Sequence, residues 1–160
     1  MKSAAQYIIP ALLVLLLCCG GVCWAISITA TGSWSRTISA SDLTAGAGSD
    51  LISTYESASD AISIDIIASL KYRVDVSKVD GNWHSNLQLF VKRTTSGTGG
   101  SGSSVSGGTS YQQVTGIATS FFSGQRNRSN VKIQLKLTGA SIQVPPAVYT
   151  TTVYYTVTDI

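Results

Sequence analysis

The stretch Ile26–Ala40 reads ISITATGSWSRTISA, and it decides the fold class. Every odd-numbered position from Ser27 to Ser39 is serine or threonine, and the even-numbered positions are apolar or small except Arg36. Successive side chains of a β-strand point to opposite faces, so this alternation predicts an extended strand with one buried face. Strands usually run to about five or six residues. The alternative is therefore two shorter strands that meet near Gly32 or Arg36.

The same period of two recurs along most of the remaining chain. The apolar sets are Ile62, Ile64 and Ile66; Tyr72, Val74 and Val76; Leu87, Leu89 and Val91; Val131, Ile133, Leu135 and Leu137; and Val153, Tyr155 and Val157. A turn at Asp80-Gly81 predicts that residues 71–79 and 83–93 form a hairpin. No segment after residue 25 shows sustained helical periodicity. The sequence thus predicts an all-β protein, an antiparallel Ig-like β-sandwich of about seven or eight strands.

The first 25 residues have the pattern of an export signal. Lys2 is the only charge before Arg36, the run from Ile8 to Leu17 is apolar, and the stretch ends in the small residue Ala25. This order is typical of a secretory signal peptide cleaved after Ala25. Two alternatives stay open: an uncleaved anchor over residues 8–26, and a lipid-modified cysteine. Under the cleavage hypothesis the protein is secreted or displayed at the cell surface, without a membrane span in its mature form.

The mature chain divides into two parts. Residues 26–40 form the N-terminal extended strand, and residues 41–160 form the β-sandwich domain. Within the domain, residues 94–110 read TTSGTGGSGSSVSGGTS, with Val105 as the one apolar residue. Glycine and serine at this density predict a flexible loop between strands.

Composition excludes several classes of function. Cys18, Cys19 and Cys23 all precede residue 26, so a mature chain of 160 − 25 = 135 residues contains no cysteine. A disulfide scaffold, a cysteine-based zinc site and a cysteine nucleophile are therefore excluded there. Its charge of 11 − 1 − 8 = +2 leaves no basic footprint for nucleic acid. With His84 as the single histidine, we expect no metal site and no cofactor.

Few residues offer chemistry. No nucleophile motif accompanies His84, and Asp65 and Asp75 each lie on a polar strand face, where solvation or pairing with a base is expected. Acids between residues 42 and 60 lack the spacing of a calcium loop. We therefore predict no catalytic residues and no enzymatic activity. The candidate surface-binding residues are Trp83 and His84, although aromatic residues in a sandwich also pack as core and cross-strand pairs.

The two ends of the chain resemble pilin-like and spore-coat-U-like subunits. The N-terminal alternation Ile26, Ile28, Ala30, Gly32, Trp34, with Ile38 further along, is similar to the extension that such subunits insert into a neighbour. The C-terminal stretch VPPAVYTTTVYYTVT is similar to their final strand. The chain departs from the pattern at Asp159, where an aromatic residue is usual, and in lacking the usual subunit disulfide.

This resemblance implies a function by self-association. Such families assemble by donor-strand complementation, in which the extension of one subunit completes the sandwich of the next. It implies an exported structural subunit of a filament, pilus or coat, with Ile26, Ile28, Ala30, Gly32, Trp34 and Ile38 as assembly residues. The first alternative is that residues 26–40 pair within their own sandwich. The second is a monomeric secreted or surface-anchored module that binds carbohydrate or a cell-surface partner.

Overall fold

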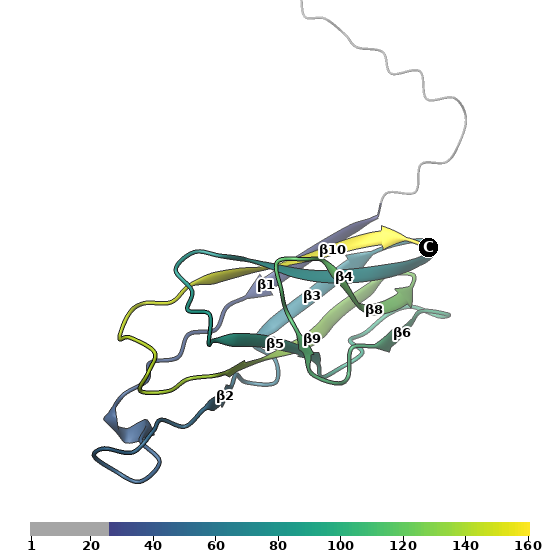
Figure 1. Ribbon diagram of the computed structural model, residues 1–160. Helices are drawn as coiled ribbons and strands as arrows, with labels where there is room; N and C mark the ends of the chain where they lie inside the picture. The colour runs from purple at the N-terminus through teal and green to yellow at the C-terminus, as the bar shows by residue number, and fades with distance from the viewer. Residues whose placement is uncertain (1–25) are drawn as a thin grey trace, which may run out of the picture.

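The computed structural model describes residues 26–160, which form two antiparallel sheets packed face to face (Figure 1). The predicted signal peptide and its alternatives lie outside the described residues. Among residues 26–160, no helix is long and apolar enough to cross a membrane. The prediction of an all-β antiparallel sandwich is confirmed.

The first sheet has the order β1-β3-β9-β5-β7. Its strands are β1 (Ser27–Gly32), β3 (Ile62–Ile67), β9 (Arg128–Thr138), β5 (Gln88–Arg93) and β7 (Gln112–Gln113). A further short strand, β2 (Thr54–Glu56), pairs with the C-terminal end of β9 and precedes β3 along the same edge.

The second sheet has the order β10-β4-β8-β6. Its strands are β10 (Thr151–Asp159), β4 (Lys71–Asp80), β8 (Thr119–Gln125) and β6 (Ser104–Gly107). A 3-10 turn, η1 (Ala40–Asp42), lies in the connection between β1 and β2. With the short strands β2, β6 and β7, residues 26–160 contain ten strands, more than the seven or eight predicted.

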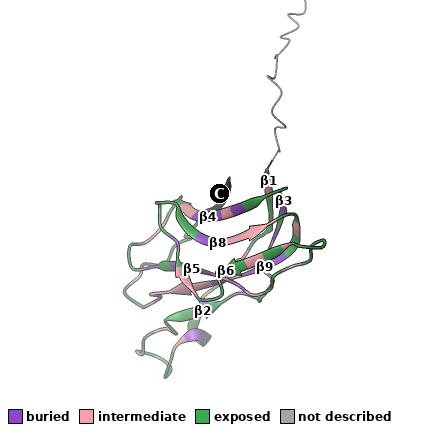
Figure 2. Cartoon of the chain, turned by 90° about the vertical axis from the view of Figure 1, so that its right-hand side faces the viewer, coloured by how far each residue is buried: buried purple, intermediate pink, exposed green. Residues whose placement is uncertain are grey.

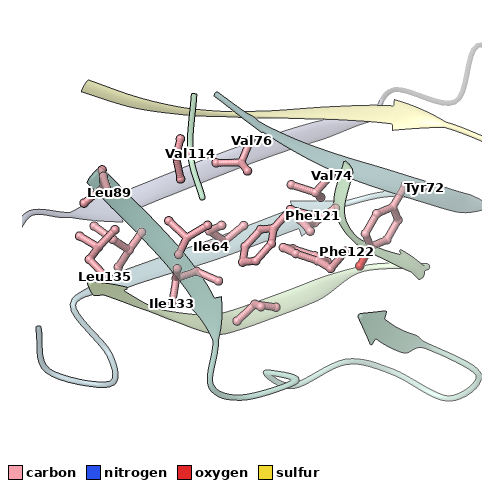
Figure 3. Packing of buried hydrophobic residues seen from close by; sticks show 14 of the residues in the cluster. Ile64, Tyr72, Val74, Val76, Leu89, Val114, Phe121, Phe122, Ile133 and Leu135 are labelled. Atoms are coloured by element: carbon pink, nitrogen blue, oxygen red, sulfur yellow. The ribbon is translucent and has the colours of Figure 1, made fainter. Parts of the chain in front are cut away.

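The core lies between the sheets and follows the period of two. On β4 the even-numbered residues Tyr72, Val74 and Val76 are buried while their neighbours are not, an alternation that Figure 2 shows along the strand. From the opposite sheet, Ile64 and Ile133 meet them (Figure 3). Burying such side chains removes apolar area from water, which is the main favourable contribution to folding.

The predicted hairpin of residues 71–79 and 83–93 is wrong. The first segment became β4 in one sheet and the second contains β5 in the other, so the two strands do not pair. Residues 81–87 cross between the sheets, and within this connection Trp83 packs against the core while Leu87 is buried. Two apolar anchors in the connection favour a crossing over a tight turn.

The glycine-rich stretch 94–110 is not a loop throughout, because residues 104–107 form β6 against β8. The side chain of Arg93, which is only 6% exposed, bonds to both ends of this stretch. Its Nε donates to the Gly107 carbonyl at 2.8 Å, and its Nη1 donates to the Thr95 carbonyl at 3.1 Å. Arg128 Nη2 donates to the Ser103 carbonyl at 2.9 Å. Carbonyl groups of this glycine-rich stretch thus find hydrogen-bond donors in the buried Arg93 and the half-buried Arg128. The mobility of the remainder stays a prediction.

Candidate assembly site

The alternation over residues 26–40 forms a strand only from Ser27 to Gly32, and residues 33–40 form no second strand. The single long strand is therefore wrong, and of the two-strand alternative only the break at Gly32 is confirmed. β1 pairs with β3 of its own chain, in a register from Ser27 opposite Ile67 to Gly32 opposite Ile62. Gly32 has φ +119°, and a Cβ there would collide with the Ala61 carbonyl. Only glycine fits this close approach at a positive φ, so the strand ends there.

One side of the sandwich, which we call the open side, is bounded by β1 and β10. These edge strands belong to different sheets and lie side by side (Figure 1). The opposite edges are β7 and β6, which are only two and four residues long. Very short edges resist pairing with other chains, whereas long, uncharged edges invite it. β1 contains no charge, and β10 contains none before Asp159.

At the end of the open side where β1 stops, the sheets enclose a groove of about 1080 Å³. One wall comes from residues 33–40, and the other from residues 140–153 that lead into β10. The floor is apolar and includes the sheet residues Ile62, Leu89, Leu135, Leu137 and Tyr155. The groove therefore reaches the edge of the inter-sheet core at one end of the molecule.

The connection from residue 33 to residue 53, which we call the strap, is fastened by two carboxylates. Asp42 is buried; its Oδ2 accepts the Ser39 N–H at 2.9 Å, and its Oδ1 accepts a bond from Arg36. Asp50 Oδ1 accepts the main-chain N–H of Ile142 at 2.9 Å. That bond joins the strap to the segment that forms the opposite groove wall.

Both carboxylates titrate below their ordinary value of 3.8. The Ser39 N–H, and then Arg36, lower the pKa of Asp42. The main-chain N–H groups of Ile142 and Leu51 lower the pKa of Asp50. Hydrogen bonds to the ionised form stabilise it in the folded state alone.

We therefore expect acid to loosen the strap. A folded-state pKa below the unfolded one contributes stability that is fully present above about pH 4 and is lost as the pH falls through the folded pKa. Between pH 5 and pH 2, the free energy of unfolding of Asp42→Asn/Asp50→Asn should fall less steeply than that of the natural chain. Denaturant unfolding at each pH measures this slope. Identical slopes for the two proteins would contradict it.

The six predicted assembly residues separate into two groups. Ile26, directly before β1, and Ile28, within it, are half-buried and pack against the core. Trp34 and Ile38 are half-buried in the strap and line the groove, while Ala30 and Gly32 are exposed at its rim. All six residues therefore lie on the open side. Four of them are in β1 or directly before it, and Trp34 and Ile38 are in the irregular strap.

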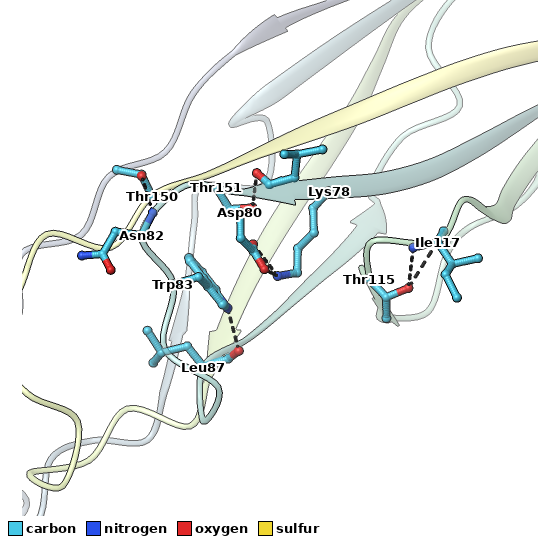
Figure 4. Close-up of polar contacts among 10 residues, drawn as sticks. Lys78, Asp80, Asn82, Trp83, Leu87, Thr115, Ile117, Thr150 and Thr151 are labelled. Atoms are coloured by element: carbon cyan, nitrogen blue, oxygen red, sulfur yellow. Dashed lines mark hydrogen bonds and ion pairs between the residues drawn. The ribbon is translucent and has the colours of Figure 1, made fainter.

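The two candidate surface-binding residues, Trp83 and His84, have different surroundings; Figure 4 shows those of Trp83. Trp83 lines the groove, donates from Nε1 to the Leu87 carbonyl at 2.9 Å, and has the Lys78 Nζ at 4.8 Å from its ring centroid. His84 is outside the groove; its Nδ1 accepts the Asn86 N–H at 3.2 Å, and its ring meets Tyr149 edge-on. Trp83 is therefore a packing residue with one face toward the groove.

The two carboxylates considered from the sequence have structural partners. Asp65 Oδ1 accepts the main-chain N–H of Asn130 at 2.8 Å, where β9 is irregular. Asp75 accepts a bidentate pair of bonds from Arg73, at 2.7 and 2.9 Å. Within residues 26–160, no three histidine, cysteine or acidic side chains are grouped as metal ligands.

The sequence did not predict the groove. Its second wall, residues 140–153, shows no sustained alternation of apolar and polar residues and is interrupted by the Pro145-Pro146 pair. No family model, curated protein or solved structure matches the chain.

Proposed function

We propose that the chain is an exported structural subunit of a surface filament, pilus or coat. It assembles when residues 26–40 of one copy add as a strand to the sandwich of the next. The main support is a difference between the sequence pattern and the observed strand. Fifteen residues, 26–40, have the alternation of a strand, but only Ser27–Gly32 form one. Residues 33–40 instead line an apolar groove.

The main chain of the strap supports this function. Among the described residues, the main-chain groups of residues 33–38 bond to no other main-chain group. The outer edge of β2 is also unpaired, because β2 pairs only with β9. A straightened segment 26–40 would keep the register of β1 on β3 and continue toward β2. Such a strand gains main-chain bonds, while its alternate side chains set the register.

Exchange between copies explains how one chain makes a filament. Each copy has one donor segment and one acceptor edge at β3, so the contact is heterologous. A heterologous contact that does not close into a ring propagates into a fibre.

A disulfide lock tests this proposal. Thr31 lies opposite Ser63 in the β1–β3 register, and a chain beginning at Ile26 contains no other cysteine, so Thr31→Cys/Ser63→Cys should fasten β1 to its own sheet when oxidised. We expect the oxidised protein to stay unassembled and the reduced protein to form fibres in electron micrographs. Oxidation after assembly should give a ladder of covalent multimers on a non-reducing gel.

Two outcomes would overturn strand exchange. One is an oxidised protein that assembles as readily as the reduced form. The other is preassembled material that yields only covalent monomers on oxidation, since every β1 would then lie in its own sandwich.

The second candidate function is a monomeric module that binds a carbohydrate or a cell-surface partner. The groove favours it, because Trp34, Trp83 and Tyr155 contribute to its lining. Ligand pockets of proteins have this apolar, concave character. Binding of oligosaccharides to the oxidised lock variant, lost in Trp34→Ala, would support this function. If neither the oxidised nor the reduced protein assembled, this binding function would replace the filament proposal.

A further inference from the structure

β10 is the longest edge strand of the described sandwich, and β1 of the other sheet lies beside it without pairing with it. The register of β10 with β4 runs without interruption from Thr151 opposite Asp80 to Asp159 opposite Tyr72, so no bulge twists it away from other chains. The strand reads TTVYYTVTD and contains no lysine, arginine, proline or glycine. Natural edge strands commonly use those residues or a bulge to prevent pairing. β10 uses none of them before its terminal Asp159.

The bonds at the two ends of β10 show which main-chain groups face outward. The Gly81 N–H donates to the Thr150 carbonyl at 3.0 Å, and the Ile160 N–H donates to the Lys71 carbonyl at 3.3 Å. Bonded and non-bonded pairs alternate in an antiparallel ladder. Even-numbered residues of β10 therefore bond to β4, and odd-numbered residues direct their N–H and C=O groups outward. Within residues 26–160, no main-chain group bonds to this outer edge.

The sequence of β10 is complementary to its own reverse. In an antiparallel pair of two copies centred on Tyr155, Val153 faces Val157 and Thr152 faces Thr158. Tyr154 faces Thr156. Odd-numbered residues then oppose odd-numbered residues, so the outward main-chain groups meet and can bond. A two-fold contact requires this self-complementarity, because the same surface serves both partners.

The side chains of β10 also favour such a pair. On the outer face, Tyr154 is 51% exposed, and an aromatic residue opposite a β-branched threonine is a favourable cross-strand pair. On the inner face, Val153, Tyr155 and Val157 pack against the core and are only half-buried. The Tyr155 hydroxyl is buried without a hydrogen-bond partner in the described structure. A second copy beside this edge would cover these three residues further.

We infer that β10 pairs with β10 of a second copy about a two-fold axis, joining the two four-stranded sheets into one. This contact is separate from strand exchange, which uses residues 26–40 and β3. It gives the subunit a lateral contact in addition to the longitudinal one, which a coat or a multi-stranded fibre requires.

Charge pairs on the outer face test both the contact and its register. The experiment uses the oxidised Thr31→Cys/Ser63→Cys protein, in which β1 cannot exchange, and measures mass by light scattering over a range of concentrations. Tyr154→Lys/Thr156→Lys places like charges opposite each other twice per dimer and should weaken dimerisation about tenfold. Tyr154→Lys/Thr156→Glu changes the same two exposed positions but places opposite charges there, and it should restore the dimer in low salt.

The outcomes separate the inference from the proposed function. A dimer that the two lysines weaken and the lysine–glutamate pair restores supports the β10 contact, whether or not fibres form. A protein that is monomeric at every concentration, or one whose dimer responds equally to both variants, overturns it. Circular dichroism confirms that each variant is folded. Tyr154→Glu/Thr156→Glu provides a second like-charge variant if the lysine pair does not fold.

Discussion

Replacing Ile64 with alanine is expected to lower the free energy of unfolding by about 2–5 kcal/mol. Ile64 lies on β3 between the two sheets with 0% of its surface exposed, in the cluster that Figure 3 shows. The truncation removes apolar contacts and leaves a cavity, because both sheets limit how far the site can collapse. Denaturant unfolding followed by tryptophan fluorescence measures the loss.

Ile67→Ala is the matched control for this prediction. Ile67 is on the same strand, three residues later, but points outward and is 60% exposed. Its truncation should change the free energy of unfolding by no more than about 0.5 kcal/mol. Equal losses at the two positions would contradict the inward facing of Ile64, and with it the assignment of the β3 faces.

Replacing Gly139 with alanine should cost about 3 kcal/mol or more, because two penalties add. Gly139 follows β9 with φ +84°, a conformation that residues with a Cβ rarely adopt. A Cβ there would also collide with the main-chain carbonyl of Asn86, in the connection that crosses between the sheets. Main-chain atoms cannot move aside as a flexible side chain can, so the backbone must shift. Thermal and denaturant unfolding report the loss.

Gly48→Ala separates the two penalties. Gly48 has a similar φ of +88°, but nothing lies within 4 Å of an added Cβ. This variant should lose only the conformational part, about 1 kcal/mol. If Gly139→Ala lowered the free energy of unfolding no more than Gly48→Ala does, the close approach of Gly139 to the Asn86 carbonyl would be wrong.

Local alternation predicted which side chains enter the core, and did so well. The faces assigned to Tyr72, Val74 and Val76, and to Ile62, Ile64 and Ile66, are the buried faces of β4 and β3. This works because the pleat has a period of two whichever strand lies alongside. The same alternation assigned Trp34 and Ile38 to an apolar face, and in the structure both residues line the groove.

Alternation does not determine where a strand begins or ends. Residues 26–40 keep the period for fifteen residues, but the strand stops at Gly32, where the Ala61 carbonyl approaches too closely for any side chain. β6 formed within a stretch that has one apolar residue, because β8 and the side chains of Arg93 and Arg128 supplied hydrogen-bond partners for its backbone and flanking carbonyls. These partners are distant in sequence.

The sequence by itself determined the all-β class, the inward faces of the main strands and the uncharged character of β1 and β10. Only the tertiary structure decided that β4 and β5 belong to different sheets, that β1 and β10 bound the same side, and that residues 33–40 and 140–153 enclose a groove. The physical reason is that the pleat is a property of each residue and its neighbours. Sheet membership and grooves depend instead on which distant segments pack together, and the total burial of the whole chain selects that arrangement.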